Sequence, residues 1–141
     1  MFRSLIGRIV SVTTSLDSML NAGTGPYGPS KAALEAYTAV LGNELAGSGT
    51  TVNVLIPGGV VDTAMIPPLK GVERGALLPP NVMVQPLLWL LSREADGLNC
   101  QRLRASHWDA SRPPHEALAA AAAPIAWSAI AAGQRRDLAR S

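Results

Sequence analysis

The sequence predicts an α/β fold, in which short parallel strands are joined by helical crossovers. Apolar and β-branched runs typical of buried strands occur at residues 8–12 and 51–56. A turn at Asp96-Gly97 leads into a third expected strand, at about residues 99–104. Helical patterns separate these runs, at residues 27–46 and at residues 81–92. This order implies right-handed crossover connections, and ligands of such sheets bind at the carboxyl ends of the strands.

The first half of the chain has clear element boundaries. The strand at residues 8–12 runs into a loop that is rich in Thr, Ser and Gly and extends to Pro26. The residues of the following helix are apolar on nearly all sides, so we expect the helix to be buried on more than one side. Gly47 and Gly49 end that helix.

The second half begins after the strand at residues 51–56. The irregular segment at residues 60–78 has the length of a lid or binding loop. In the next helix we expect Pro86 to produce a kink near the first turn. Residues 113 onward predict an Ala-rich helix and then a frayed tail. We therefore divide the chain into residues 1–109 and an Ala-rich helix and tail at residues 110–141.

Composition and charge exclude several classes of protein. A hydrophobic content of 48% with 16% charged residues predicts a globular chain rather than a disordered one. A net charge of +2 is too small to indicate nucleic-acid binding, and the basic residues at 134–136 are expected to be a solvated terminus. Cys100 is the single cysteine, so no intrachain disulfide can form, and no metal site is expected.

No membrane-spanning segment is expected either. The longest apolar run, residues 119–130, is mostly alanine and contains Pro124. The first eight residues lack the apolar run of a signal peptide. We therefore expect a cytoplasmic protein.

The pair Tyr27 and Lys31 is the first candidate for chemistry. Side chains four residues apart on a helix lie on the same face, one turn apart. A cation close to a phenol favours its ionised form, which makes tyrosine a usable general acid or base near neutral pH. Taken alone, the pair could equally be an ordinary exposed contact.

The surroundings of this pair extend the pattern. The strand at residues 8–12 runs into Thr13, Thr14 and Ser15, and Thr14 lies 13 residues before Tyr27. The next strand ends in Pro57-Gly58, with Thr63 shortly after. This combination resembles the short-chain dehydrogenase/reductase family, over roughly residues 7 to 109.

The resemblance implies a set of site residues. Tyr27 would be the general acid/base, and Lys31 would favour its ionised form and hold the nicotinamide ribose. Thr14 would polarise the substrate carbonyl, with Ser15 as a substitute, because the family usually has Ser there. The nicotinamide end of the cofactor, NAD or NADP without distinction, would contact four further residues: Pro57, Gly58, Val61 and Thr63. The turn is one residue longer than the family pattern, so Val60 stays an alternative to Val61.

The resemblance also implies a fold and a function. We expect a partial Rossmann-like parallel sheet that lacks the N-terminal nucleotide-binding half, because no Gly-rich turn follows a first strand. The implied activity is NAD(P)-dependent interconversion of a small-molecule alcohol and a carbonyl. The alternative is a truncated, non-catalytic remnant or interaction module that cannot bind the cofactor alone. An exposed edge at residues 8–12 and the apolar helix predict a homo-oligomer.

Overall fold

The structure is a computed structural model that describes residues 6–68, 71–128 and 130. The expectations for the first five residues and for residues 134–136 lie outside that part of the chain. The strands and helices are β1 (Gly7–Val12), α1 (Tyr27–Glu44), β2 (Thr50–Ile56), α2 (Val84–Leu91), β3 (Gln101–Arg104), α3 (Pro114–Ala121) and β4 (Ala122–Pro124). Short 3-10 helices cover Arg74–Ala76, Pro80–Met83, Arg93–Ala95 and Ala105–His107.

The sheet has the strand order β1-β2-β3-β4. β1 pairs with β2 and β2 with β3 in parallel, whereas β4 pairs with β3 in the antiparallel direction. The expectation of a parallel sheet is therefore wrong, because the sheet is mixed. The reason is that α3 ends at Ala121 and the chain continues directly as β4, with no crossover that would bring it back parallel to β3.

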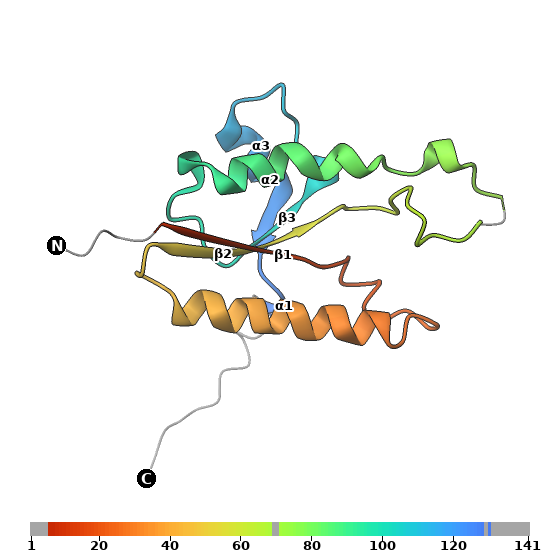
Figure 1. Ribbon diagram of the computed structural model, residues 1–141, viewed down its shortest axis with the longest axis horizontal. Coiled ribbons are helices and arrows are strands. Elements are labelled where there is room, and N and C mark those ends of the chain that lie inside the picture. Colours follow the sequence, from red (N-terminus) through yellow and green to blue (C-terminus); the bar gives the residue numbers. More distant parts are fainter. Residues whose placement is uncertain (1–5, 69–70, 129, 131–141) are drawn as a thin grey trace, which may run out of the picture.

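Helices cover both faces of this sheet (Figure 1). α1 lies on one side, and α2 and α3 lie on the other. Every residue of β2 from Thr51 to Ile56 is buried, as expected for a central strand covered on both faces. The alternation of side chains along β2 divides the interior into two apolar layers.

One apolar layer lies beneath α2 and α3 and centres on Leu55, Leu90 and Leu103. The other lies against α1 and contains Val54, Ile56 and Ile125. Arg102 pairs in register with Val54, so it belongs to the face of the sheet that α1 covers. A charged side chain therefore enters an otherwise apolar layer.

The helices differ from expectation in two details. α1 buries one face only, formed by Gly28, Glu35, Thr38 and Gly42, while Tyr37 on the opposite side is 63% exposed. The expectation that this helix is buried on more than one side is thus not met within one chain, because Tyr37 and Val40 are exposed on the face away from the sheet. α2 begins at Val84, so Pro86 occupies the first turn, where its missing N–H costs no helical hydrogen bond.

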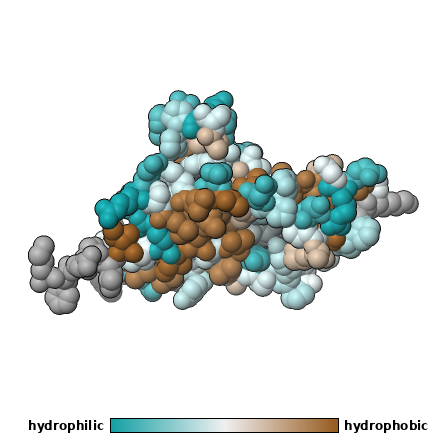
Figure 2. All heavy atoms as spheres, turned by 45° about the horizontal axis from the view of Figure 1, so that its top comes forward, coloured by the Kyte–Doolittle hydropathy of each residue, from teal (hydrophilic) through white to brown (hydrophobic). Residues whose placement is uncertain are grey.

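β1 forms one edge of the sheet in the part of the chain that the structure describes. Its residue Val12 is exposed, as are Leu88 and Leu91 of the neighbouring helix α2. Figure 2, which brings the α2 side forward, shows apolar side chains gathered in a broad area of this surface. Among the described helices, none has the length and apolar content needed to cross a membrane.

Candidate active site

A cavity of about 810 Å³ opens at the carboxyl ends of β1, β2 and β3. The loop after β1, the start of α1, the loop after β2 and the end of β3 all contribute to its walls. Parallel strands bring these segments together although they are far apart in the sequence. All eight residues predicted from the sequence line this cavity: Thr14, Ser15, Tyr27, Lys31, Pro57, Gly58, Val61 and Thr63. Their individual roles stay predictions.

Tyr27 and Lys31 lie on the first turns of α1, facing the cavity. The Lys31 ammonium nitrogen is 5.9 Å from the centre of the Tyr27 ring. Its hydrogen bond goes to the backbone carbonyl of Val12, at 2.9 Å. An ammonium group has three protons, so Lys31 keeps donors for a bound molecule.

Three consecutive hydroxyl residues follow β1, and they have different surroundings. The Thr13 hydroxyl is buried and donates to a carboxylate oxygen of Glu35 at 2.7 Å. The Ser15 hydroxyl is 2.6 Å from the hydroxyl of Ser18. The hydroxyl of Thr14 has no hydrogen-bond partner among the described residues, so it is available to a molecule in the cavity.

Ser15 also acts on the acidic residue of this loop. Its hydroxyl and the backbone of Ser18 hold the pKa of Asp17 below its ordinary value, because both hydrogen bonds stabilise the carboxylate. Asp17 lines the cavity together with Arg104, which lies at the end of β3. The cavity therefore contains a fixed negative charge beside the positive charges of Lys31 and Arg104.

The loop after β2 is stabilised by contacts with residues further along the chain. Arg74 donates to the side chain of Asp62 at 2.8 Å and to the backbone carbonyl of Thr63 at 3.1 Å. Val61 forms an isolated parallel bridge with Leu78. Both Val60 and Val61 line the cavity, so each remains a candidate for contact with the nicotinamide end of the cofactor.

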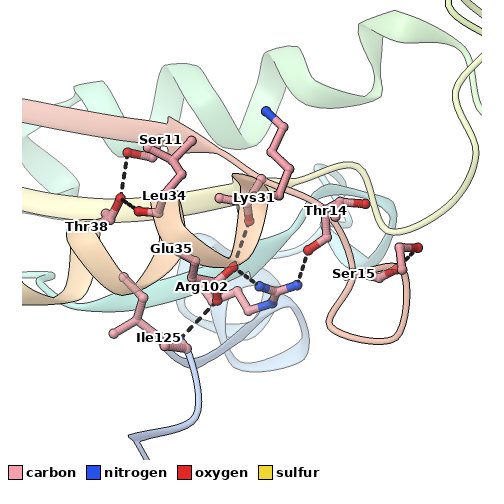
Figure 3. A network of polar contacts seen from close by, with 12 residues as sticks. Ser11, Thr14, Ser15, Lys31, Leu34, Glu35, Thr38, Arg102 and Ile125 are labelled. Atoms are coloured by element: carbon pink, nitrogen blue, oxygen red, sulfur yellow. Dashed lines mark hydrogen bonds and ion pairs between the residues drawn. The ribbon is translucent and has the colours of Figure 1, made fainter. Parts of the chain in front are cut away.

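A buried polar network lies directly behind the cavity, and the sequence analysis missed it. The guanidinium of Arg102 on β3 forms an ion pair with Glu35 of α1 and donates to the backbone carbonyl of Thr14 (Figure 3). Glu35 is fully buried. The signal available in the sequence was a carboxylate within an otherwise apolar helix, one turn after Lys31.

Comparison with known proteins identifies the family. A family model described as short chain dehydrogenase matches residues 1–71, which is half of the 141 residues. The chain belongs to the short chain dehydrogenase family. Members of this family typically use NAD or NADP as cofactor.

Curated relatives of this short chain dehydrogenase chain come from bacteria and plants. It is 39% identical over 72 residues to the 3-oxoacyl-(acyl-carrier-protein) reductase FabG of Pseudomonas aeruginosa, covering 51% of this chain and 29% of the relative. It is 48% identical over 54 residues to the chloroplastic NADPH-dependent aldehyde reductase 2 of Arabidopsis thaliana, covering 38% of this chain and 20% of the relative. The chain thus spans under a third of the length of these two relatives.

Solved structures of short chain dehydrogenases resemble this fold. The short chain dehydrogenase of Salmonella enterica serovar Typhi superposes with a TM-score of 0.63 at 26% identity, covering 70% of this chain and 41% of that one. A putative short chain dehydrogenase from Pseudomonas syringae gives a TM-score of 0.60 at 26% identity, covering 70% and 40%.

The family match corrects two expectations. We expected only the C-terminal catalytic half of a short-chain dehydrogenase/reductase, over residues 7 to 109, without the nucleotide-binding start. The match covers residues 1–71 instead, which is the N-terminal portion of this chain. That portion contains β1, a loop with Gly23 and Gly25, and α1, so a glycine-containing strand–loop–helix unit is present and its predicted absence is wrong. The prediction was wrong because the loop with Gly23 and Gly25 was interpreted as a simple connection between β1 and α1.

Proposed function

We propose that this chain carries the reacting side chains of an NAD(P)-dependent oxidoreductase that interconverts an alcohol and a carbonyl by hydride transfer. One observation supports the proposal above all others. Tyr27, Lys31 and Thr14, which come from a helix and from the loop after a neighbouring strand, line the same cavity. A proton donor, a cation and a free hydroxyl are the groups that carbonyl reduction requires from a protein.

Each of the three groups has one task in this proposal. During reduction the Tyr27 phenol gives its proton to the substrate oxygen, and in the oxidative direction the phenolate takes that proton back. The Thr14 hydroxyl donates a hydrogen bond to the same oxygen, and it is the better candidate than Ser15, whose hydroxyl is 2.6 Å from that of Ser18. Lys31, whose ammonium nitrogen is 5.9 Å from the centre of the Tyr27 ring, has the task of binding the cofactor beside Tyr27.

The residues around the cavity suit a nicotinamide cofactor. The free donors of Lys31 and the hydroxyl of Thr63 can bind ribose hydroxyls, while Pro57, Gly58 and Val61 offer a largely apolar wall. When bound, the cofactor supplies or accepts the hydride. NADPH is the first form to test, because the Arabidopsis relative is an NADPH-dependent aldehyde reductase.

The substitution Tyr27→Phe tests the proposal. It removes the phenol and leaves the ring, so turnover of an aldehyde or ketone with NADPH should fall by roughly two orders of magnitude or more. The matched control is Tyr37→Phe, on the exposed side of the same helix. Turnover is followed at the nicotinamide absorbance band, with circular dichroism as the check on folding. Activity in Tyr27→Phe equal to that of the control would overturn the assignment.

The alternative is a chain that does not catalyse the reaction by itself. A calorimetric titration of the chain with NADH and NADPH separates the two proposals. Binding below a dissociation constant of about 1 mM supports the oxidoreductase. Millimolar cofactor that produces no heat and no change in tryptophan fluorescence supports the non-catalytic module.

A further inference from the structure

We propose that Arg102 and Glu35 are positioning residues, which together fix the orientation of Thr14 at the edge of the cavity. The proposal rests on the function proposed above, because it assigns a purpose to the orientation of the Thr14 hydroxyl. It concerns two buried side chains that lie behind the cavity and do not line it.

Arg102 acts on the Thr14 backbone through the shape of its guanidinium. One terminal nitrogen pairs with Glu35, and the other donates to the carbonyl oxygen of Thr14 (Figure 3). The fork of a guanidinium is planar and rigid, so the two contacts fix each other's direction. Arg102 is 7% exposed, which protects both contacts from exchange with water.

Glu35 joins the loop after β1 to two other parts of the chain. One of its carboxylate oxygens accepts from the Thr13 hydroxyl at 2.7 Å and also faces Arg102. The other oxygen accepts from the backbone amide of Ala126 at 3.0 Å. Glu35 is therefore supplied with donors from the loop, from β3 and from the segment after β4.

Together, Glu35 and Arg102 fix the orientation of two consecutive residues of the loop, Thr13 and Thr14. The Thr13 hydroxyl is drawn inward by Glu35, and the Thr14 carbonyl is drawn inward by Arg102. With these two groups held on the inner side, the Thr14 side chain is left on the cavity side. Without the Arg102 contact the backbone at Thr14 would no longer be held, and a shift of this loop would carry the hydroxyl away from a substrate oxygen.

Stability alone is a poor explanation for this pair. A buried ion pair is often no more stabilising than well-packed apolar residues in the same volume, because removing both charges from water is costly. Here the pair interrupts the apolar layer of Val54, Ile56 and Ile125, where such residues would pack. What apolar residues could not supply is a donor to the Thr14 carbonyl.

The test compares two Arg→Lys substitutions. Arg102→Lys keeps a cation beside Glu35 but replaces two separate guanidinium nitrogens by one ammonium nitrogen, so it does not reproduce the planar fork that reaches both Glu35 and the Thr14 carbonyl. Arg8→Lys is the matched control, because Arg8 is a similarly buried arginine on β1 that pairs with Asp96 outside the cavity. Arg102→Lys should lower kcat at least tenfold with KM for the carbonyl changed less than threefold. Arg8→Lys should leave both constants unchanged.

A second readout does not depend on catalysis. In Arg102→Lys the carbonyl ¹³C resonance of Thr14 should move upfield as its hydrogen bond is lost, while Arg8→Lys leaves it in place. If no variant turns over, the proposed function fails, and the Thr14 resonance still decides whether Arg102 positions the loop. An unchanged resonance overturns the proposal. So does a fall in kcat that Arg8→Lys shares, or one that only follows a lower unfolding temperature.

Discussion

The Lys31 ammonium group donates a hydrogen bond to the backbone carbonyl of Val12, across a distance of 2.9 Å. This contact connects the first turns of α1 to the last residue of β1. The edge strand and the helix that carries Tyr27 are therefore joined at the mouth of the cavity. Lys31 has a structural partner as well as the proposed catalytic one, and its substitution should affect both.

Replacement of Lys31 by methionine should weaken cofactor binding at least tenfold, because a hydrogen bond to a charged group contributes about 1.5–3 kcal/mol. Lys31→Arg keeps the charge and should recover part of the affinity. The control is Arg112→Met, which removes a cation that pairs with Asp109 away from the cavity. Dissociation constants for NADPH come from calorimetry. Equal affinities for Lys31→Met and the control would contradict the assigned role.

Gly42 should tolerate no side chain, although it lies within a helix. A Cβ at Gly42 would collide with the sulfur of Cys100. In an open helix position Gly→Ala stabilises by about 0.5–1 kcal/mol, whereas here overpacking should destabilise by about 1–3 kcal/mol. Urea unfolding measures the difference. The double variant Gly42→Ala with Cys100→Ala should recover most of the loss, and strictly additive effects would show that the sulfur is not the obstacle.

The Cys100 thiol should react slowly with iodoacetamide at neutral pH. Burial raises the pKa of this thiol, because the thiolate loses solvation. The thiolate is the reactive form, so its fraction at a given pH is lower in the folded chain than in the unfolded one. The alkylation rate should therefore rise at higher pH than for the same chain in urea, and coincident pH profiles would be evidence against the burial effect. Because the folded state retains the proton more strongly, stability should decline as the pH rises above the ordinary thiol pKa.

Self-association is a further expected property. Among the residues that the structure describes, β1 forms a sheet edge with exposed Ile9 and Val12, and α1 exposes Tyr37 and Val40 on the face away from the sheet. Unpaired strand edges and apolar helix faces both recruit partners. Sedimentation velocity at micromolar concentration should show homo-oligomers, and Ile9→Lys or Val40→Glu should shift the distribution toward monomer. A sharp monomer boundary at all concentrations would contradict this expectation.

Sequence patterns located the main elements well. The strand at residues 8–12, the helix beginning at Tyr27, and the strand at residues 51–56 appear in the structure with boundaries shifted by two residues or fewer. These segments carry strong local signals, namely β-branched runs and flanking glycines. The predicted site residues line one cavity for the same reason, since strand ends in a parallel arrangement meet at one edge.

The missed features depend on contacts between distant residues. β4 is three residues long with the sequence Ala-Ala-Pro, which has no strand preference of its own. It is a strand only because it pairs with β3, next to which the chain arrives at the end of helix α3. The Glu35–Arg102 pair is likewise invisible to local patterns, because 67 positions separate the two residues. A buried carboxylate such as Glu35, in the middle of a largely apolar helix, indicates that a partner exists but does not identify it.

The wide separation of Glu35 from its partners sets an order of events during synthesis. β1, α1 and β2 are consecutive in the chain, so they can assemble soon after residue 56 has emerged. The donors from Arg102 and Ala126 arrive 67 and 91 residues after Glu35. Until then the Glu35 carboxylate stays hydrated, and no Arg102 donor fixes the direction of the Thr14 carbonyl. A ribosome-bound chain would thus possess the helix of Tyr27 and Lys31 well before it possesses an aligned Thr14 hydroxyl.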